Sequence, residues 1–344
     1  MTYLITGGAG FIGSAVARAL IKQKRHVVVF DALTYAGTRT NLAEVEGDPH
    51  FTFVKGNICD TALVLATLKK YKVTKIMHLA AESHVDRSIH APGQFIETNL
   101  VGTSSMLIAA LEFYQNMEAS CAAEFKFHHI STDEVFGDLG PQDPPFDEMT
   151  PYGPRSPYSA SKAGSDFLVD AWHHTYGLPV VITNCSNNYG PYHFPEKLIP
   201  RTLIRALKGM DILVYGQGTN VRDWLYVEDH AEALIKVLQN GRVGERYAIG
   251  GNAERTNNEV VQAICHSLDR LRPRPDGKSY REQIAYVTDR AGHDRRYAIN
   301  FQKIRDELGW RPKTNFEDGI ARTIAWYLDN ESWWRPLWLE GDSR

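Results

Sequence analysis

YLITGGAGFIG, residues 3–13, decides the fold of this chain, because it runs from a short apolar strand through a glycine turn into a helix. Gly7, Gly10 and Gly13 permit the tight turn and let the backbone at Phe11 and Ile12 come close to a ligand. The amino end of the helix favours the pyrophosphate of a dinucleotide. Glycines alone can also form a purely structural turn, so the surrounding sequence has to distinguish the two.

The second expected strand, residues 26–31, favours the dinucleotide. It ends in Asp31, 18 residues after Gly13, where a carboxylate accepts hydrogen bonds from the adenosine ribose and repels a 2′-phosphate. NAD is therefore expected rather than NADP. Further cofactor contacts are expected where the third and fourth strands end, at Asn57, Ile58, Leu79, Ala80, Ala81 and Ser83.

Short β-branched runs alternate with amphipathic stretches through the first half of the chain. Candidate strands span residues 3–6, 26–31, 51–55, 75–79, 125–131 and 180–184, and candidate helices span residues 11–22, 61–71 and 93–114. This rhythm predicts an α/β fold, a Rossmann-like doubly wound parallel sheet with helices on both faces.

The rhythm loosens after about residue 188, where glycine and proline become more frequent. A smaller mixed α/β lobe is expected there, with helices near residues 195–208, 227–239, 257–271 and 316–329. We therefore predict a cofactor-binding domain over residues 1–188 and a mainly substrate-binding lobe over residues 189–344, with an interleaved boundary. The Pro-, Gly- and Asp-rich stretch 138–157 is either a surface loop or a mobile wall of the site.

Composition excludes several classes of function. A hydrophobic content of 43% and a net charge of −3 are ordinary for a globular protein and give no reason to expect nucleic acid or membrane as a partner. Neither a leader peptide nor a membrane span is expected. The four cysteines are scattered, which indicates no zinc site and no disulfide framework and favours a cytoplasmic location.

Two short motifs carry the expected chemistry. Tyr158 and Lys162 are four residues apart, so on a helix they share one face, and the ammonium is expected to lower the pKa of the phenol. The tyrosinate then acts as base in the oxidation of an alcohol. Thr132, Asp133 and Glu134 end a buried strand and add an acid and a base that oxidation does not need, which predicts a second step, the elimination of water. The plainer readings are a surface helix pair and a solvated strand end.

Longer stretches resemble the extended short-chain dehydrogenase/reductase superfamily and, within it, the dTDP-glucose 4,6-dehydratases. The similar stretches are DALTYAG (31–37), HLAAESHVDRS (78–88), STDEVFG (131–137), NCSNNYGPYHFPEKLIP (184–200), RDWLYVEDH (222–230) and GHDRRYAI (292–299). The similarity runs from about residue 3 to residue 334. Phe136 replaces a usual tyrosine and Ala291 a usual proline, and neither change removes a group that the chemistry needs.

The resemblance implies that dTDP-glucose becomes dTDP-4-keto-6-deoxyglucose, an intermediate of deoxysugar biosynthesis, through a tightly bound NAD. Tyr158 with Lys162 would take the C4 hydroxyl proton, with Thr132 hydrogen-bonded to the same hydroxyl. Glu134 would remove the C5 hydrogen, and protonated Asp133 would donate to the departing C6 hydroxyl, since neighbouring carboxyls push their pKa values apart. Further cofactor contacts are implied at Leu33, Thr34, Thr98 and Asn188.

The resemblance also implies a site for the sugar nucleotide and a dimer. The substrate residues would be Ser83, Thr132, Asn187, Lys197, Leu198, Leu213, Tyr215, Arg222, Asn257, Arg290 and His293. From the sequence alone, Arg222 could equally pair with Asp223 or Asp229. Helices near residues 93–114 and 156–174 would form a homodimeric four-helix bundle, although their apolar faces could instead only cover the sheet.

Two other functions remain as competitors. An NAD-dependent nucleotide-sugar 4-epimerase shares the oxidation at C4 but has no use for Asp133 and Glu134. A non-catalytic NAD-sensing protein would not be expected to keep both Tyr158 and Lys162. His128 and His129 are interpreted as strand packing rather than metal ligands, and Cys185 as a buried apolar side chain rather than a nucleophile.

Overall fold

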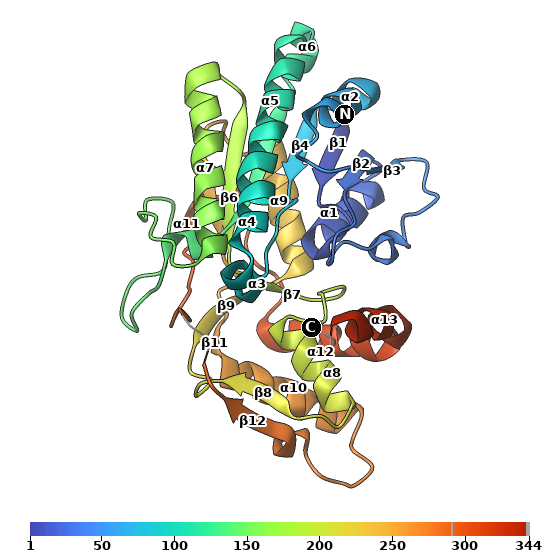
Figure 1. Cartoon of the computed structure of the whole chain (residues 1–344), viewed down its shortest axis with the longest axis vertical. Helices are drawn as coiled ribbons and strands as arrows, with labels where there is room; N and C mark the ends of the chain where they lie inside the picture. Colours follow the sequence, from blue (N-terminus) through green and yellow to red (C-terminus); the bar gives the residue numbers. More distant parts are fainter. Residues whose placement is uncertain (290–291, 342–344) are drawn as a thin grey trace.

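A computed structural model describes residues 1–289 and 292–341, and in it a seven-stranded sheet carries the larger lobe (Figure 1). Every neighbouring pair of strands in this sheet is parallel. In sheet order the strands are β10 (Arg246–Ile249), β6 (Val180–Cys185), β5 (Lys126–Thr132), β4 (Lys75–His78), β1 (Thr2–Thr6), β2 (His26–Asp31) and β3 (Phe51–Lys55). The strand order reverses between β1 and β4, and such a switch point is where open α/β sheets bind their ligands.

Helices cover both faces of the sheet, as a doubly wound fold requires. α1 (Phe11–Lys22), α9 (Val227–Asn240) and α11 (Gln302–Leu308) lie on one face, and α2 (Thr61–Tyr71), α5 (Gly102–Gln115) and α7 (Pro157–Tyr176) on the other (Figure 1). Alternate residues of one strand supply the two cores. Ile5 packs with α1 and α9, whereas its neighbour Leu4 packs with α2 and α5. The predicted fold class is confirmed.

The smaller lobe lies beyond the carboxyl ends of the strands (Figure 1). It holds a three-stranded sheet of β11 (Glu254–Thr256), β9 (Val221–Tyr226) and β7 (Asn187–Tyr189), and a two-stranded sheet of β12 (Ile284–Val287) and β8 (Ile212–Tyr215). α8 (Leu198–Leu207), α10 (Asn257–Leu271), α12 (Phe316–Asp329) and α13 (Glu331–Gly341) pack around them. The remaining short elements are η1 (Arg39–Leu42), α3 (Val85–His90), α4 (Pro92–Phe95), η2 (Ile96–Val101), α6 (Ala119–Ala122), η3 (Asp133–Phe136) and η4 (Tyr280–Gln283).

The chain crosses between the lobes more than once. α9 packs against α1, and β10 joins the main sheet beside β6, although both follow residue 188. The stretch 138–157 is hydrogen-bonded to residues 298–300. The Phe146 amide donates to the Ala298 carbonyl, and the Asn300 amide donates to the Phe146 carbonyl. The division at residue 188 stays a prediction, and these crossings are the form that its interleaved boundary takes.

Several predicted element bounds need correction. The fifth strand, for example, runs from Lys126 to Thr132 rather than over residues 125–131. The helix expected over residues 93–114 is interrupted by the π-helical turn η2, which gives way to α5 at Gly102. The helix expected from residue 195 begins at Leu198, because the Lys197 amide first closes a turn onto the Phe194 carbonyl. The fourth strand ends at His78 rather than residue 79. No described helix is long and apolar enough to cross a bilayer.

Four histidines are buried beneath the switch region. His78 bonds Thr6 and Thr103, and His128 bonds Thr183. His129 and His230 are equally enclosed. Burial lowers the pKa of His129 to about 4 and that of His230 to about 3, and it holds the pKa values of His78 and His128 well below the ordinary value. Among the described residues, no group of three or more His, Cys, Asp or Glu side chains could hold a metal ion.

These histidines predict loss of stability in acid. Below about pH 6.5 the unfolded chain takes up protons at the His129 and His230 rings, while the folded chain does so only near pH 4 and pH 3. The free energy of unfolding should therefore fall as the pH drops through this window, by up to about 1.4 kcal/mol per pH unit for each ring. Urea unfolding at several pH values measures the slope.

A pair of variants assigns this slope to a buried ring. His230→Gln should give a shallower slope than the wild type, because one buried neutral ring is gone. His266→Gln, at an exposed position of α10, should leave the slope unchanged. Equal slopes for the wild type and His230→Gln would show that the buried rings do not set the acid stability.

Candidate active site

The glycine turn between β1 and α1 leaves no room for side chains. Gly7 has φ +67°, and a Cβ on it would lie 2.7 Å from the Ala80 nitrogen. A Cβ on Gly13 would lie 2.2 Å from the Gly7 carbonyl oxygen. No side chain caps α1, which begins at Phe11 and Ile12 after Gly10, so its first amides keep their donors for a ligand. This cradle fits the pyrophosphate of a dinucleotide.

Replacing Gly13 by Ala should displace this loop. The added methyl group collides with backbone, which has no rotamer to yield, so NAD affinity is expected to fall more than about tenfold, or 1.4 kcal/mol. Isothermal titration with NAD after removal of resident cofactor measures the loss. Gly93→Ala in α4, where a Cβ meets nothing within 4 Å, is the matched control. Unchanged affinity in Gly13→Ala would exclude the loop as the pyrophosphate site.

Asp31 ends β2 beside this loop, as predicted. Its carboxylate accepts from the Ala9 amide at 2.9 Å and from the Leu33 amide at 2.8 Å. Burial raises the pKa of Asp31, and these two amides oppose the rise. Leu33 has φ +56°, and with Thr34 it begins the turn that follows the carboxylate. The Asp31 carboxylate is therefore placed to accept hydrogen bonds from the hydroxyls of a ribose bound at this strand end.

The ends of β3 and β4 carry the other predicted cofactor residues. Ile58 is buried against Gly102 of α5, and Asn57 accepts from the Cys59 amide. The Ala80 amide, next to Leu79 and Ala81, bonds Thr6. The Ser83 carbonyl accepts from Lys197 at 3.2 Å, so the end of β4 meets the segment before α8. These contacts bring residues of both lobes to the same sheet edge.

η2 supplies a residue that the sequence did not reveal. Its π-helical turn contains Thr98, a predicted cofactor residue, and Asn99, which is fully enclosed. The Asn99 amide group bonds both the NH and the carbonyl of Glu82, and donates to the Ser161 hydroxyl at 2.8 Å. Asn99 therefore fixes the loop after β4 to α7. An isolated asparagine in an expected helix carries no signal for this role.

The turn after β5 brings Thr132, Asp133 and Glu134 together. The Thr132 hydroxyl donates to Asp133 at 3.2 Å and accepts from the Glu134 amide at 3.3 Å. Asp133 is 2% exposed, and one of its carboxyl oxygens is buried without a hydrogen-bond partner. Burial and the neighbouring Glu134 raise the pKa of Asp133 well above its usual range. Both effects favour the protonated form of Asp133, which is the form that can serve as an acid.

α7 places Tyr158 and Lys162 against this turn. Ser156 caps the helix by accepting from the Ser159 amide, and Pro157 occupies the first helical position. Both catalytic candidates are buried, and the Tyr158 and Thr132 hydroxyls share a hydrogen bond. Lys162 donates to the Ile130 carbonyl at 2.9 Å. A base, a hydroxyl partner and a cation thus meet at the carboxyl end of β5.

We expected the Lys162 ammonium to lower the pKa of Tyr158. In the protein without a bound ligand this expectation is wrong. Burial and the negative charge of Glu134 raise the pKa of Tyr158 well above its ordinary value, and the bond to Thr132 opposes them only partly. Lys162 donates to a carbonyl, and burial lowers its own pKa. The phenol is therefore protonated until a further positive charge favours the phenolate.

Cys185 and Asn188 lie at the end of β6 and on β7, next to the catalytic turn. Burial raises the pKa of the Cys185 thiol, which donates to the Ser131 carbonyl, so it fits the predicted apolar role rather than that of a nucleophile. Asn188, a predicted cofactor residue, bonds His230 at 2.9 Å and the Ser186 carbonyl at 3.0 Å.

The predicted nucleotide residues lie in the smaller lobe. Leu213 and Tyr215 belong to β8, Leu198 opens α8, and Asn257 opens α10. Asn187, on β7, has a buried oxygen without a partner. His293 bonds Asp289 at 2.7 Å near the end of β12. Arg290 lies outside the described residues, as does Ala291.

Arg222 does not pair with Asp223 or Asp229. Its guanidinium donates to the Val221 and Asp294 carbonyls and lies 4.2 Å from the centre of the Tyr297 ring. Asp223 instead accepts from the Gly251 and Ala253 amides, and Asp229 accepts from the Lys313 and Thr314 amides. The guanidinium of Arg222 is therefore held by carbonyls, and its positive charge also acts on the carboxyl of Asp133, whose pKa it lowers.

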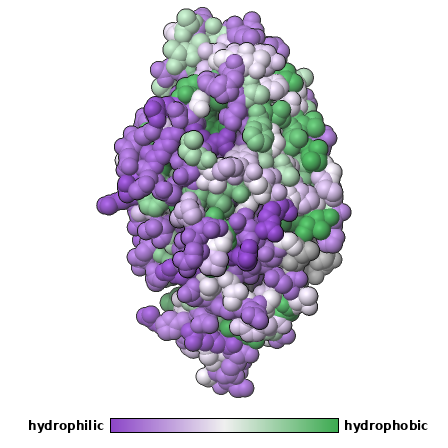
Figure 2. Space-filling model, turned by 90° about the vertical axis from the view of Figure 1, so that its left-hand side faces the viewer, coloured by the Kyte–Doolittle hydropathy of each residue, from purple (hydrophilic) through white to green (hydrophobic). Residues whose placement is uncertain are grey.

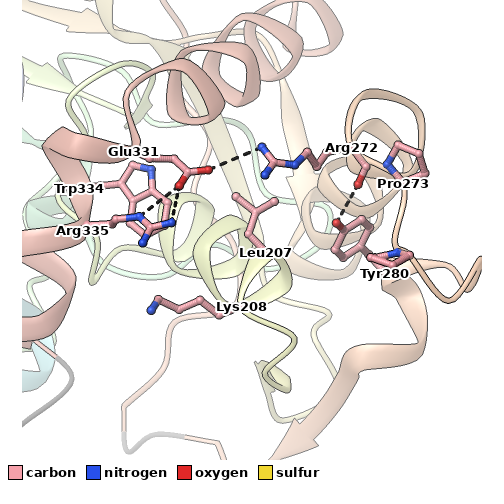
Figure 3. A pocket seen from close by; sticks show the side chains of 9 residues that line it. Leu207, Lys208, Arg272, Pro273, Tyr280, Glu331, Trp334 and Arg335 are labelled. Carbon is pink, nitrogen blue, oxygen red and sulfur yellow. Dashed lines mark hydrogen bonds and ion pairs between the residues drawn. The ribbon is translucent and has the colours of Figure 1, made fainter.

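A separate cavity of about 290 Å³ opens in the smaller lobe between α8, α13 and residues 272–280 (Figure 3). Glu331 lies between Arg272 at 3.6 Å and Arg335 at 2.7 Å. None of the predicted site residues lines it. Arg272 and Arg335 are already paired with this carboxylate, and the cavity is apart from the catalytic arrangement.

Comparison with known proteins agrees with this geometry. The family model described as GDP-mannose 4,6 dehydratase matches residues 4–323. A dTDP-glucose 4,6-dehydratase of Xanthomonas campestris pv. campestris (strain B100) is 57% identical over 343 residues, which span 100% of this chain and 97% of that protein. The dTDP-glucose 4,6-dehydratase 1 of Escherichia coli (strain K12) is 54% identical, over 97% of this chain and 94% of that protein.

A solved structure is similar over nearly the whole chain. It is DesIV, a dTDP-glucose 4,6-dehydratase from Streptomyces venezuelae, solved with NAD and TYD bound. The TM-score is 0.89 at 45% sequence identity, and the match covers 98% of this chain and 100% of that one.

Proposed function

Since this chain belongs to the dTDP-glucose 4,6-dehydratase family, we propose that it converts dTDP-glucose into dTDP-4-keto-6-deoxyglucose. The reaction oxidises C4, eliminates water across C5–C6 and returns the hydride to C6, so the enzyme is an NAD-dependent hydro-lyase. Buried Asp133, between Glu134 and the Thr132 that adjoins Tyr158, is the observation that carries this function. The family model is named after a GDP sugar, whereas the relatives above half identity are named for dTDP-glucose.

Oxidation is assigned to Tyr158, Thr132 and Lys162. Thr132 forms a hydrogen bond with the substrate C4 hydroxyl. Tyr158 takes the proton of that hydroxyl as C4 loses its hydride. Bound NAD supplies the hydride acceptor and a positive ring charge, which favours the phenolate of Tyr158. The cradle from Gly7 to Gly13 and the carboxylate of Asp31 are the groups that would hold it.

Elimination is assigned to the two carboxyls. The C4 ketone acidifies the C5 hydrogen, and Glu134 removes it as general base. Asp133, whose pKa is raised by burial and by Glu134, donates its proton to the leaving C6 hydroxyl. Hydride returns to C6 and a proton to C5, so the cycle is redox-neutral and NAD is not consumed.

The nucleotide of the substrate is assigned to the smaller lobe. Arg222 and His293 would bind the pyrophosphate, together with Arg290 outside the described residues. Lys197, Leu198, Leu213, Tyr215, Asn187 and Asn257 would surround the nucleoside. The burial of Arg222 among carbonyls supports this, because the positive charge of a buried guanidinium favours an anionic ligand.

A nucleotide-sugar 4-epimerase is the second candidate. It needs Tyr158, Lys162 and NAD but leaves water in the substrate. Burying the Asp133 carboxyl with one oxygen lacking a hydrogen-bond partner costs free energy, and an epimerase has no step that uses this carboxyl. The dehydratase is therefore favoured.

Mass spectrometry of the product tests the proposed function. Purified protein incubated with dTDP-glucose, without added reductant, should yield a dTDP-sugar that has lost one water. Unchanged mass with conversion to the galactose epimer would establish the second candidate. Unchanged substrate would contradict both.

We further propose a homodimer formed by α5, η2 and α7. Ile96, Val101, Ile108 and Phe167 lie on these elements and are between 44% and 59% exposed. Figure 2 shows hydrophobic side chains gathered on the upper part of the face that includes α7. Exposed large apolar side chains on neighbouring helices are typical of an interface.

Phe167→Glu should convert this dimer to a monomer, because it places a charge in the apolar surface. Analytical ultracentrifugation measures the mass. Met149→Glu, at an 86% exposed position outside these helices, is the control and should remain dimeric. A wild-type monomer would contradict the proposal.

A cytoplasmic location is proposed from the cysteines. All four are free thiols, and Cys185 and Cys265 are buried. Reduced cysteines without a disulfide are typical of a reducing compartment.

A further inference from the structure

Asp166 is a buried carboxylate for which the reaction above has no role. It lies one helical turn after Lys162 on α7, and its side chain is fully enclosed. One oxygen accepts from the Tyr152 hydroxyl at 2.6 Å and from the Asn184 amide at 3.3 Å. The other oxygen lies 3.1 Å from Nε2 of His129. Burying an ionised carboxyl is costly unless nearby cations and donors compensate it.

Lys162 is the buried cation one turn before Asp166 on α7, and its ammonium donates to the Ile130 carbonyl rather than forming a direct ion pair with Asp166. Burial lowers the pKa of Lys162, and the charge of Asp166 opposes this change. From the sheet, His129 and His78 also feel the ammonium, and both are neutral because burial lowers their pKa values. On β6, Cys185 faces it as a thiol.

The surroundings of Asp166 contain two further charges. Asp170, the next turn of α7, pairs with Arg246 at 2.8 Å. The same guanidinium lies 4.8 Å from the centre of the Tyr152 ring. Arg246 is thus compensated by Asp170, and Asp166 is the carboxylate one turn from Lys162 on α7.

Asp166 is also connected to the catalytic turn. The Asn184 amide that reaches Asp166 donates to the Thr132 carbonyl at 3.1 Å. The carbonyl belongs to the residue whose hydroxyl bonds Tyr158. A single carboxylate therefore touches the helix of Tyr158 and Lys162 and, through Asn184, the strand end of Thr132.

We propose that Asp166 is a positioning residue for the oxidation step, the counter-ion that keeps buried Lys162 charged and the anchor that holds Asn184 on the Thr132 backbone. This proposal rests on the proposed function, because the role of Asp166 is tested by the rate of C4 oxidation. Asp166 touches neither substrate nor cofactor in this account. It acts through Lys162 and Asn184.

Asp166→Asn removes the negative charge of the side chain while keeping its size and shape. The amide oxygen can still accept from Tyr152 and Asn184, and the amide nitrogen then faces the neutral His129 ring, which can accept from it. The probe is dTDP-xylose, which lacks C6 and so undergoes C4 oxidation without water loss. The rate of formation of reduced nicotinamide is followed by ultraviolet absorbance as a function of pH.

In Asp166→Asn, the alkaline limb of this profile should move to lower pH by about one to two units, because Lys162 loses its proton more easily without the carboxylate. Asp166→Glu should restore the wild-type limb. Asp170→Asn removes a carboxylate one turn away and should leave the limb in place. An unchanged limb in Asp166→Asn, with wild-type rates, overturns the proposal.

Two further measurements keep the result decisive. A wild-type protein that forms no reduced nicotinamide would refute the proposed function rather than the role of Asp166. If Asp166→Asn does not fold, nitrogen-15 NMR of the wild-type lysine side chains, with the signal assigned by Lys162→Arg, replaces it. Lys162 must then be charged near neutral pH, and a neutral amine overturns the proposal.

Discussion

Glu134→Gln is expected to abolish exchange of the substrate C5 hydrogen with solvent while oxidation at C4 remains measurable. The amide keeps the shape of the carboxylate but cannot accept the proton, and loss of a general base costs about 10²–10⁴-fold in rate. Water loss needs the C5 carbanion, so overall turnover should fall by the same factor. Oxidation depends on Tyr158 and should survive.

Proton NMR of substrate in deuterium oxide measures this exchange, and the absorbance of reduced nicotinamide measures the oxidation. Glu317→Gln, at the start of α12 and paired with Arg255, is the matched control and should exchange like the wild type. Wild-type exchange in Glu134→Gln would mean that another group is the base.

Asp133→Asn is expected to slow the departure of the C6 hydroxyl by about 10²–10⁴-fold, because the amide cannot donate the proton that the leaving group needs. Asp133 is suited to this role by its burial and by Glu134, which both raise its pKa. Oxidation precedes this step, so reduced nicotinamide should accumulate in the variant. Exchange at C5 should remain, since Glu134 is intact.

A substrate with fluorine in place of the C6 hydroxyl separates the acid role from a structural one. Fluoride leaves with less need of protonation, so elimination by Asp133→Asn should recover towards the wild-type rate. Stopped-flow absorbance and product mass spectrometry follow both substrates. A variant equally slow with both, or one that turns over dTDP-glucose normally, would remove Asp133 from the acid role.

Much of the larger lobe could be predicted because its signals are local. The glycine turn, Asp31 at a strand end and the alternation of apolar runs are all visible within a few residues, and the bounds of β2, β3, α1 and α2 are as expected. The short strands of the smaller lobe are three to six residues long and depend on distant partners. The return of β10 to the main sheet is likewise a tertiary event that no local pattern encodes.

In the candidate site too, residues in contiguous motifs could be predicted, whereas residues that depend on distant partners could not. Tyr158 with Lys162, and Thr132 with Asp133 and Glu134, are contiguous motifs, so the sequence predicts their chemistry. Asn99 bonds Glu82 and Ser161, 17 and 62 residues away, and Asp166 bonds Asn184, 18 residues away; both residues were missed. The direction of the Tyr158 pKa was wrong because spacing reveals the nearby ammonium but not the burial that outweighs it.

The path of one hydrogen tests the central claim most directly. dTDP-glucose carrying deuterium at C4 should give a product with that deuterium at C6, because the hydride taken from C4 is returned there within one active site. Mass spectrometry and deuterium NMR locate the label. Deuterium retained at C4 in an epimerised sugar, or lost to solvent, would contradict the account.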